Sequence, residues 1–219
     1  MKKAILFGAT GFIGSSLLEE LLRSPDYDQV TTVVRKKIET EHVKHKMLIG
    51  DLQSLPDIKD QIQGDDVFIA LGTTQKKTPR QDEYYKIDHD YPVLAAKIAK
   101  ENGAKSVLLV TSVGANANSN TFYLRTKGES ERDILALSFE HTHIFRPSIL
   151  LGQREESRPM EKFYIHLWSI LDPIFVGPLN RYRGIAGKDV AKAMVNAARR
   201  PSEKIAIHHW QEMQALLSH

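Results

Sequence analysis

The sequence predicts an α/β protein built on a doubly wound, mostly parallel sheet with a small C-terminal lobe. Short apolar runs recur along the 219-residue chain, and each run is followed by a segment with apolar residues at helical spacing. The runs lack the polar alternation of half-exposed strands, so these strands are expected to be buried on both faces. Buried strands that alternate with amphipathic helices are typical of a parallel sheet covered by helices on both sides.

The expected elements follow one another in a regular order. Strands are expected at residues 4–7, 29–34, 46–49, 67–71, 107–110 and 142–145. Helices are expected at residues 12–23, 57–63, 82–101, 122–137 and 188–199. The length suits one hydrophobic core, so residues 1–219 are expected to form a single domain, with residues 148–185 as a small substrate lobe or lid.

Composition and charge narrow the class of protein. The net charge is only +3 and the basic pairs are scattered among acids, which argues against nucleic acid as the main ligand. The absence of cysteine excludes disulfides and cysteine metal sites. His166, Asp172, Pro173 and Pro178 interrupt the apolar stretch 163–179, so no membrane span is expected. The N-terminal apolar run is too short for a secretory signal. We expect a cytoplasmic protein with a small-molecule partner, and nothing indicates an oligomer.

A glycine-rich segment lies between the first expected strand and the first expected helix. Its three glycines follow the spacing G-x-x-G-x-x-G, a variant of the dinucleotide-binding fingerprint. Glycines allow a sharp turn and a close approach to a pyrophosphate, which then faces the N–H groups at the helix N-terminus. A tight turn that binds no ligand is the alternative. The predicted cofactor contacts in this segment are Gly8, Thr10, Gly11, Phe12, Ile13 and Gly14.

The residue after the second expected strand bears on the choice of coenzyme. In NAD-binding proteins, an acidic residue about 20 positions beyond the glycines accepts a hydrogen bond from the ribose 2′-hydroxyl. Arg35 takes that place here, followed by Lys36 and Lys37. No acid is there to repel a 2′-phosphate and a guanidinium can bind one, so NADP (NADPH) is expected rather than NAD. The alternative is a solvated basic turn that contacts no ligand.

Two further segments are candidates because they follow expected strands. Asp51 and Leu52 come after the third strand and are placed to meet the adenine, although Asp51 could equally cap the turn that follows. Leu71, Gly72 and Thr73 come after the fourth strand and could run beside the pyrophosphate and the nicotinamide ribose. Both assignments rest on the rule that ligands bind at the carboxyl ends of parallel strands.

A serine, a tyrosine and a lysine are the candidates for catalysis. Ser112 follows the fifth expected strand, and Tyr123 and Lys127 share one face of the next expected helix. A free tyrosine has a pKa near 10, and a nearby lysine cation lowers that value and eases proton transfer at neutral pH. Tyr-x-x-x-Lys arises easily by chance, so its place after a glycine loop and a strand-end serine is what makes it informative.

These motifs together resemble a known family. The segments concerned are GATGFIG at the N-terminus, LGTT at 71–74, IDHDYPVLAAKIAKENGAK at 87–105, TSVGA after the fifth strand, YLRTKGESE at 123–131 and FRPSILLGQREESRP at 145–159. The chain resembles the extended or atypical short-chain dehydrogenases/reductases, and more narrowly the small oxidoreductases related to the HIV-Tat-interacting protein. This resemblance implies an NAD(P)-binding Rossmann domain over nearly the whole chain.

The resemblance also implies a role for each candidate residue. Tyr123 would be the general acid in reduction, Lys127 would hold the nicotinamide ribose hydroxyls, and Ser112 would polarise the carbonyl. The segment Arg146-Pro147-Ser148 would lie along the nicotinamide side. Thr111 instead of Ser112 could be the hydroxyl that faces the site. The C-terminal lobe is shorter than in members with larger substrates, which leaves the substrate pocket undefined.

The sequence therefore predicts an NADP(H)-dependent oxidoreductase that moves a hydride between the nicotinamide and a small carbonyl or alcohol substrate. One alternative is a regulatory or scaffold protein that binds NADP(H) without turnover. Another is a dehydratase or epimerase acting on a sugar nucleotide, which would need further acid–base residues and a larger lobe. Intact Ser112, Tyr123 and Lys127 favour the enzyme, because a pure sensor has no use for a proton donor.

Several other features are expected to be structural or have more than one interpretation. The histidine pairs His141–His143 and His208–His209 could chelate a metal, but no third ligand appears at suitable spacing, so structural roles are expected. An aromatic stretch could form a lid, core or a subunit contact, with lid or core favoured. Two arginines before it could bind an anionic substrate or lie in solvent. These residues are Phe163, Tyr164, Trp168, Arg154 and Arg158.

Overall fold

A seven-stranded parallel sheet forms the centre of the structure, a computed structural model that describes residues 1–152, 177–199 and 203–218. The strand order is β3-β2-β1-β4-β5-β6-β9, and each neighbouring pair is parallel. The strands are β1 (Lys2–Phe7), β2 (Tyr27–Val34), β3 (His45–Ile49), β4 (Asp66–Ile69), β5 (Ser106–Val110), β6 (His141–Phe145) and β9 (Ile205–His208). Two short strands, β7 (Leu150–Leu151) and β8 (Ile185–Ala186), pair separately.

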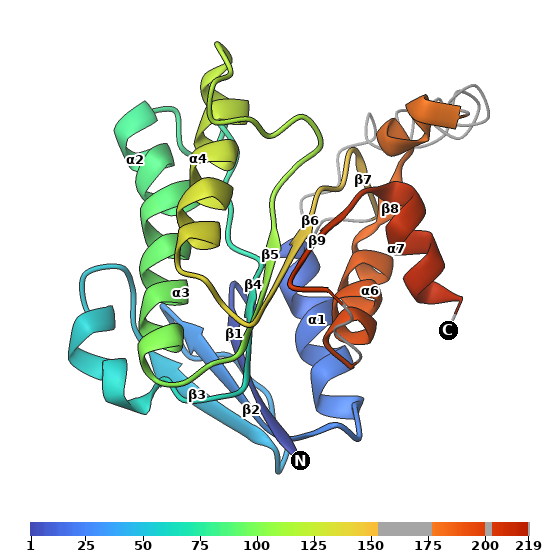
Figure 1. The fold of residues 1–219 in the computed structure, drawn as a ribbon. Helices are drawn as coiled ribbons and strands as arrows, with labels where there is room; N and C mark the ends of the chain where they lie inside the picture. Colours follow the sequence, from blue (N-terminus) through green and yellow to red (C-terminus); the bar gives the residue numbers. More distant parts are fainter. Residues whose placement is uncertain (153–176, 200–202, 219) are drawn as a thin grey trace.

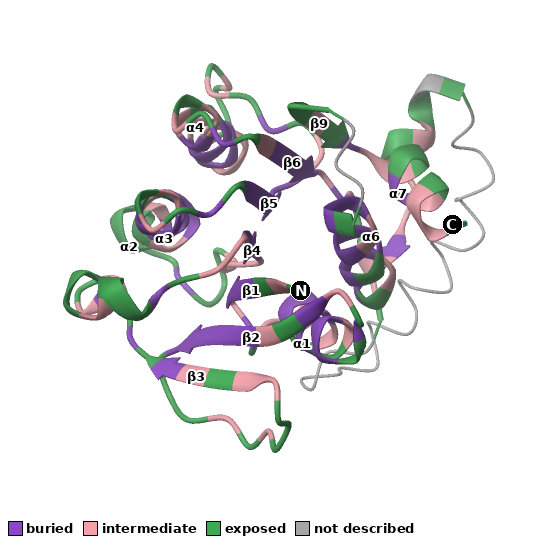
Figure 2. Cartoon of the chain, turned by 60° about the horizontal axis from the view of Figure 1, so that its bottom comes forward, coloured by how far each residue is buried: buried purple, intermediate pink, exposed green. Residues whose placement is uncertain are grey.

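Helices cover both faces of the sheet. The α-helices are α1 (Phe12–Arg23), α2 (Gln81–Tyr85), α3 (Tyr91–Glu101), α4 (Phe122–Ala136), α6 (Gly187–Arg199) and α7 (Trp210–Leu217). The α3 and α4 helices lie on one face, and α1 and α6 lie on the other, with α7 packed against α6 (Figure 1). Buried residues gather on the strands and on the inward sides of these helices (Figure 2).

Strand β1 shows why both faces need helices. Ala4 and Leu6 join the core that α1 and α6 complete, whereas Ile5 and Phe7 join the core on the α3 side. All four side chains are fully buried. Because successive residues of a strand point to opposite faces, an unbroken apolar run requires a covered sheet. The predicted doubly wound, parallel fold is confirmed.

The strand order places a ligand-binding position beside β1. The chain runs outward from β1 to β2 and β3, then returns to β4 on the other side of β1. The carboxyl ends of β1 and β4 lie together, with Phe7 paired to Ile69. In open α/β sheets, ligands bind outside the carboxyl ends of the strands at such a switch point. The glycine-rich segment begins directly after β1.

The expected helix at 82–101 is wrong as a single element. The structure divides it into α2, a π-helical turn at Lys86–Asp90, and α3. Pro92 lies in the first turn of α3 and has no N–H to continue the hydrogen-bond ladder from the preceding residues. Single π turns inside helices are frequent at functional sites. This turn includes Asp88, which the sequence analysis did not consider.

Other differences concern short elements. The expected helix at 57–63 is a 3-10 helix, Leu55–Gln61, with Pro56 in its first turn. The fourth strand ends at Ile69 instead of residue 71, because the N–H of Ala70 makes the last bond to Phe7, at 3.0 Å, before the chain turns. The elements β7, β8, β9 and α7 were not predicted, since two to four strand residues carry almost no periodic signal.

The expected lobe at 148–185 lies only partly within the described residues. Its described portions are β7, a 3-10 helix at Gly177–Tyr182, and β8. The aromatic and basic candidates Phe163, Tyr164, Trp168, Arg154 and Arg158 lie outside the described residues. Within the residues that the structure describes, no helix is long and apolar enough to cross a bilayer.

Candidate active site

The glycine-rich segment turns sharply at the end of β1. Gly8 has a φ of +89°, a conformation that residues with a Cβ rarely adopt, and an added Cβ would lie 2.5 Å from the carbonyl oxygen of Ala70. At Gly14 an added Cβ would lie 1.9 Å from the carbonyl oxygen of Gly8. Glycine is therefore required at Gly8 for the turn and at Gly14 for the close approach of helix and strand.

The start of α1 is suited to an anion. Gly11 occupies the N-cap position and has no side chain with which to cap the first N–H groups of the helix. These N–H groups and the helix dipole together favour a phosphate at this place. Thr10 is exposed beside the turn, whereas Ile13 is buried in the core, so only the backbone of Ile13 is available to a ligand.

Phe12 connects the glycine segment to the C-terminal part of the chain. Added Cβ atoms on Gly152 and Gly187 would lie 2.9 Å and 2.7 Å from the Phe12 ring. The ring is therefore packed between the backbone after β7 and the first residue of α6. The sequence analysis placed Phe12 at the cofactor, and the structure shows that its side chain also has this packing role.

The ends of β2 and β3 bring Arg35 and Asp51 near Tyr91. Burial raises the pKa of the Tyr91 phenol to about 12, and the nearby charge of Asp51 adds to this effect while that of Arg35 opposes it. Arg35, Lys36 and Lys37 are all exposed. The cation that was expected to bind a 2′-phosphate is thus accessible where β2 ends.

The structure shows the capping role that was the alternative for Asp51. Its Oδ1 atom accepts hydrogen bonds from the backbone N–H groups of Gln53 and Ser54 and from the Ser54 hydroxyl, at 2.9–3.0 Å. These bonds hold the pKa of the Asp51 carboxyl below its usual value. The side chains of Leu52 and Leu71 are partly buried and pack against the core on the α3 side.

The hydroxyls of Thr111 and Ser112 differ in their partners. Thr111 Oγ1 donates to Glu131 Oε1 at 2.5 Å, so this hydroxyl is engaged in the interior. Ser112 Oγ is buried and has no hydrogen-bond partner among the described residues. Unpaired buried hydroxyls are uncommon in native proteins and call for a ligand or water to complete them. Ser112 is therefore the better candidate to face a substrate.

Tyr123 and Lys127 lie one turn apart on α4, next to the end of β4. The Tyr123 ring lies edge-on to the buried Tyr84 ring, with 6.5 Å between ring centres. Lys127 Nζ is 2.7 Å from Asp88 Oδ1 and would be 3.4 Å from a Cβ placed on Gly72. The lysine thus reaches the segment that follows β4, where the sequence analysis placed the nicotinamide ribose.

Arg146, which was expected along the nicotinamide side, has its guanidinium bound to a carboxylate. It pairs with Glu131 of α4, with Nε 2.9 Å from Oε1 and Nη2 in contact with Oε2. The adjacent Pro147 accepts a hydrogen bond of 2.9 Å from the N–H of Val113, which ties the end of β6 to the segment after Ser112. Arg146 and Pro147 therefore join the end of β6 to α4 and to the segment after Ser112.

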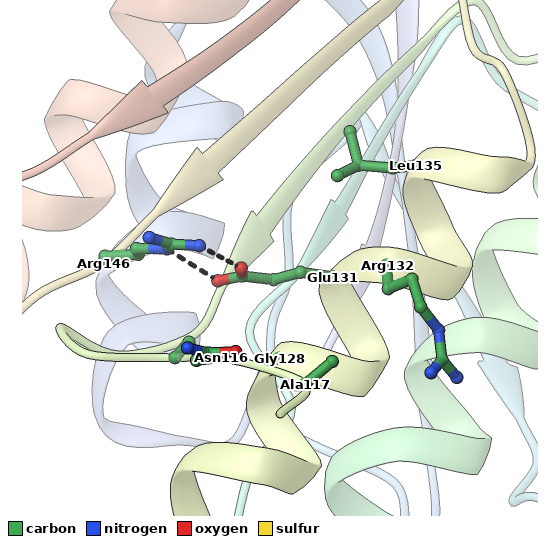
Figure 3. Close-up of a pocket in the computed structure, with 8 residues that line it drawn as sticks. Asn116, Ala117, Gly128, Glu131, Arg132, Leu135 and Arg146 are labelled. Atoms are coloured by element: carbon green, nitrogen blue, oxygen red, sulfur yellow. Dashed lines mark hydrogen bonds and ion pairs between the residues drawn. The ribbon is translucent and has the colours of Figure 1, made fainter. Parts of the chain in front are cut away.

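A pocket of about 440 Å³ lies beside this ion pair, and Figure 3 draws the residues that line it. It is lined by Ala115, Asn116, Ala117, Gly128, Glu131, Arg132, Leu135 and Arg146. The α4 residues in this lining recur every three or four positions and so share one helix face. Tyr123 and Lys127 are not in this lining and meet Tyr84 and Asp88.

Sequence reasoning missed three buried residues that shape the site, namely Tyr84, Asp88 and Glu131. Asp88 follows Tyr84 by four positions and precedes Tyr91 by three, so it falls on the buried face of a helical pattern. An acidic residue at a core position was the signal that could have identified it. Glu131 is buried on α4 as well.

The histidines form a structural pair. His143 and His208 stack across β6 and β9, with His143 Nδ1 3.0 Å from His208 Nε2. Burial lowers the pKa of each imidazole to about 4, so both are neutral at pH 7. In the described part of the chain, no cluster of three or more His, Asp or Glu side chains is suited to a metal ion.

A glycine turn at the switch point of a doubly wound sheet, with an uncapped helix start beyond it, defines a nucleotide-binding α/β protein of the Rossmann class. A family model described as NAD(P)H-binding matches residues 8–201. The chain belongs to this NAD(P)H-binding family. The resemblance to the family of the HIV-Tat-interacting protein is confirmed by the relatives named next.

Relatives and a solved structure agree with this assignment. Protein FMP52, mitochondrial, from Meyerozyma guilliermondii is 39% identical over 203 residues, which cover 91% of this chain and 86% of that protein. Protein HTATIP2 from Rattus norvegicus is 36% identical over 164 residues, covering 73% and 67%. The UDP-Glc/GlcNAc 4-epimerase of Campylobacter jejuni superposes with a TM-score of 0.71 at 12% identity, covering 100% of this chain and 82% of that one, which shows the fold alone.

Proposed function

We propose that this protein is an NADP(H)-dependent oxidoreductase that transfers a hydride between the nicotinamide and a small carbonyl or alcohol substrate. The observation that supports it most is the unpartnered, buried hydroxyl of Ser112 at the end of β5. It accompanies a tyrosine and a lysine on α4, and the lysine reaches the segment after β4. A protein that only sensed the coenzyme would gain nothing from a buried hydroxyl held ready for a substrate oxygen.

The residues present suit a bound dinucleotide. Gly8 and Gly14 leave no room for a Cβ, and the first N–H groups of α1 have no side-chain cap at Gly11, so a pyrophosphate can approach the backbone. The exposed guanidinium of Arg35 supports NADP(H) over NAD(H), because it can pair with a 2′-phosphate and stands where NAD-binding proteins have an acid that accepts a hydrogen bond from the 2′-hydroxyl.

Each side chain has a defined task in this proposal. The nicotinamide, when bound, supplies or accepts the hydride. Ser112 donates a hydrogen bond to the substrate oxygen and so favours the negative charge that develops on it in reduction. Tyr123 gives its phenolic proton to that oxygen in reduction and takes it back in oxidation. Lys127 binds ribose hydroxyls and favours the phenolate left on Tyr123.

Deuteride transfer tests this function. NADPH carrying deuterium at the nicotinamide C4 is incubated with the protein and a metabolite extract, and labelled alcohols are sought by mass spectrometry. We expect a labelled product with the wild type and none with Tyr123→Phe, whose NADPH affinity stays unchanged. NADPH binding without label in any product would support the regulatory alternative, and a fully active Tyr123→Phe would remove this residue from the mechanism.

The compartment belongs to the same proposal. The sequence favours a cytoplasmic protein, while the relatives named FMP52 carry the word mitochondrial in their names. Fractionation of cells that produce the protein, with antibody detection, decides between the two compartments. Cofractionation with mitochondrial matrix markers would contradict the cytoplasmic expectation.

A further inference from the structure

Asp88 is a fully buried carboxylate that joins two parts of the candidate active site. Its Oδ2 atom accepts a hydrogen bond of 2.9 Å from the backbone N–H of Thr73. Its Oδ1 atom lies 2.7 Å from Lys127 Nζ. A Cβ placed on Gly72 would be 3.4 Å from both Asp88 Oδ1 and Lys127 Nζ, so the ion pair lies against the backbone that follows β4.

Both charges of this pair are shielded from solvent, so water cannot take the place of either partner. The side chain of Asp88 is 0% exposed and that of Lys127 is 8% exposed. Removing one member of a buried ion pair leaves the other charge uncompensated, which is strongly unfavourable. The ammonium group therefore stays beside Asp88, and the position of Asp88 determines the position of Lys127.

The residue one helical turn before Asp88 adds no negative charge beside it. Tyr84 stands one helical turn earlier, and its buried phenol has a pKa raised by burial and by the charge of Asp88. The Tyr84 side chain therefore stays neutral. Because the Tyr84 ring also lies edge-on to Tyr123, the same short segment contacts both members of the Tyr-x-x-x-Lys motif.

The contact between Asp88 and Lys127 leaves donors of the ammonium available. It is an ion pair without the alignment of a hydrogen bond, and the Oδ1 atom has no hydrogen-bond partner in the described part of the chain. An ammonium has three N–H donors. Held in place by charge, Lys127 can direct its donors to hydroxyl groups of a ligand beside Gly72.

We propose that Asp88 is a positioning residue, which fixes the Lys127 ammonium and the backbone of residues 72–73 as one unit that binds the coenzyme ribose. The inference rests on the proposed function, because it needs NADP(H) at this site. Asp88 touches no coenzyme atom in this scheme and acts through Lys127. Its contribution to coenzyme affinity therefore vanishes once Lys127 is replaced.

A double-mutant cycle on NADPH affinity tests this inference. NADPH dissociation constants are measured by fluorescence titration for the wild type, Asp88→Asn, Lys127→Met and the double variant. We expect each single variant to bind NADPH about tenfold more weakly, the loss expected for one charge-assisted hydrogen bond. The double variant should be no weaker than Lys127→Met, because both changes remove the same interaction.

Asp66→Asn serves as the matched control. Asp66 is also buried and pairs with a lysine, Lys2, at 3.1 Å, but it lies at the start of β4, at the opposite end of the sheet. Thermal unfolding of each variant is recorded in parallel. We expect Asp66→Asn to lower the Tm while keeping wild-type NADPH affinity, which separates loss of stability from loss of positioning.

Each other outcome has a definite meaning. Wild-type affinity in Asp88→Asn overturns the inference, as does a double variant about a hundredfold weaker than the wild type, since independent contributions would multiply. If a single variant does not fold because it buries a lone charge, the double variant, which buries none, is compared with the wild type: a loss of about tenfold supports the inference and one of about a hundredfold overturns it. A wild type that binds neither NADPH nor NADH overturns the proposed function itself, and that result comes before any variant is compared.

Discussion

Arg146 and Glu131 form a two-point ion pair between the end of β6 and the middle of α4. The Nε atom of Arg146 lies 2.9 Å from Glu131 Oε1, and its Nη2 atom contacts Oε2. The same carboxylate accepts a hydrogen bond from Thr111, which directly follows β5. One buried carboxylate thus fixes the relative positions of β5, β6 and α4, and with them Ser112 and Tyr123.

Replacing Glu131 by glutamine should therefore destabilise the protein severely. The amide keeps the shape but leaves the Arg146 guanidinium without a counter-charge, and breaking a buried pair costs about 3–5 kcal/mol. The free energy of unfolding is measured by urea denaturation. Asp82→Asn is the control, because it removes one partner of an exposed pair with Arg80 and should change little. A loss for Glu131→Gln no larger than that of the control would contradict the role of this pair.

Arg35→Ala should change the preference between coenzymes. The loss of a charge-assisted hydrogen bond to the 2′-phosphate should weaken NADPH binding about tenfold or more and leave NADH binding nearly unchanged. Both dissociation constants are measured by fluorescence titration. Arg23→Ala, on the exposed end of α1, should alter neither constant. Equal losses for the two coenzymes would show that Arg35 does not contact the 2′-phosphate.

Neighbouring hydroxyls should respond to removal in opposite ways. Ser112→Ala deletes a buried hydroxyl that has no partner among the described residues, so the free energy of unfolding should stay the same or rise by about 1 kcal/mol, while turnover falls. Thr111→Val removes the hydrogen bond to Glu131 and should lower the free energy of unfolding by about 1–3 kcal/mol. Chemical denaturation of both variants gives the comparison. A larger destabilisation for Ser112→Ala would mean that its hydroxyl has a structural partner.

Substitution of two glycines by alanine should have different effects, because one causes a steric clash and the other only backbone strain. Gly14→Ala would place a Cβ 1.9 Å from the Gly8 carbonyl oxygen, so it should displace the loop, abolish NADPH binding and cost about 3 kcal/mol or more. Gly103→Ala has nothing within 4 Å but a φ of +93°, so it should cost about 1–2 kcal/mol and leave binding intact. Thermal unfolding and NADPH titration check both. Normal NADPH binding by Gly14→Ala would contradict the close approach of α1 to β1.

The histidine pair should make stability depend on pH. His143 and His208 have pKa values of about 4 in the folded protein, below the ordinary value of 6.5. As the pH falls, the unfolded chain takes up protons first. The contribution of the two histidines to the free energy of unfolding is therefore fully present above pH 6.5 and is lost progressively towards pH 4. The difference corresponds to roughly 3 kcal/mol for each histidine at the limit. Urea denaturation across this range should show a shallower decline for His208→Gln, and an unchanged slope would refute the assignment.

The fold was predictable because its signals are local. The bounds of α1 agree with the expected 12–23, since Gly11 and the Ser24–Pro25 pair mark its ends in the sequence. The sheet followed from apolar runs buried on both faces. By contrast, β9 has four residues and is defined by its pairing with β6, more than 50 positions earlier. Such an element depends on tertiary pairing and has little sequence signal of its own.

The candidate site was predictable only in part, for a similar reason. The glycine spacing and Tyr-x-x-x-Lys stand within single elements, so a pattern can show them. Asp88 meets Lys127 across 39 positions of chain, from a π turn that Pro92 helps to create. The sequence also left two roles for Asp51 equally open, because a turn cap and a ligand contact use the same carboxylate. Only the structure shows the hydrogen bonds of the cap.

The packing of Phe12 has a consequence for the rest of the chain. Its ring belongs to the glycine segment yet rests on the backbone at Gly152 and Gly187. Thermodynamic linkage is reciprocal, so whatever stabilises one side of this contact must stabilise the other by the same amount. A dinucleotide held at the glycine segment should therefore slow amide hydrogen exchange around β7 and β8, although neither strand touches the phosphates.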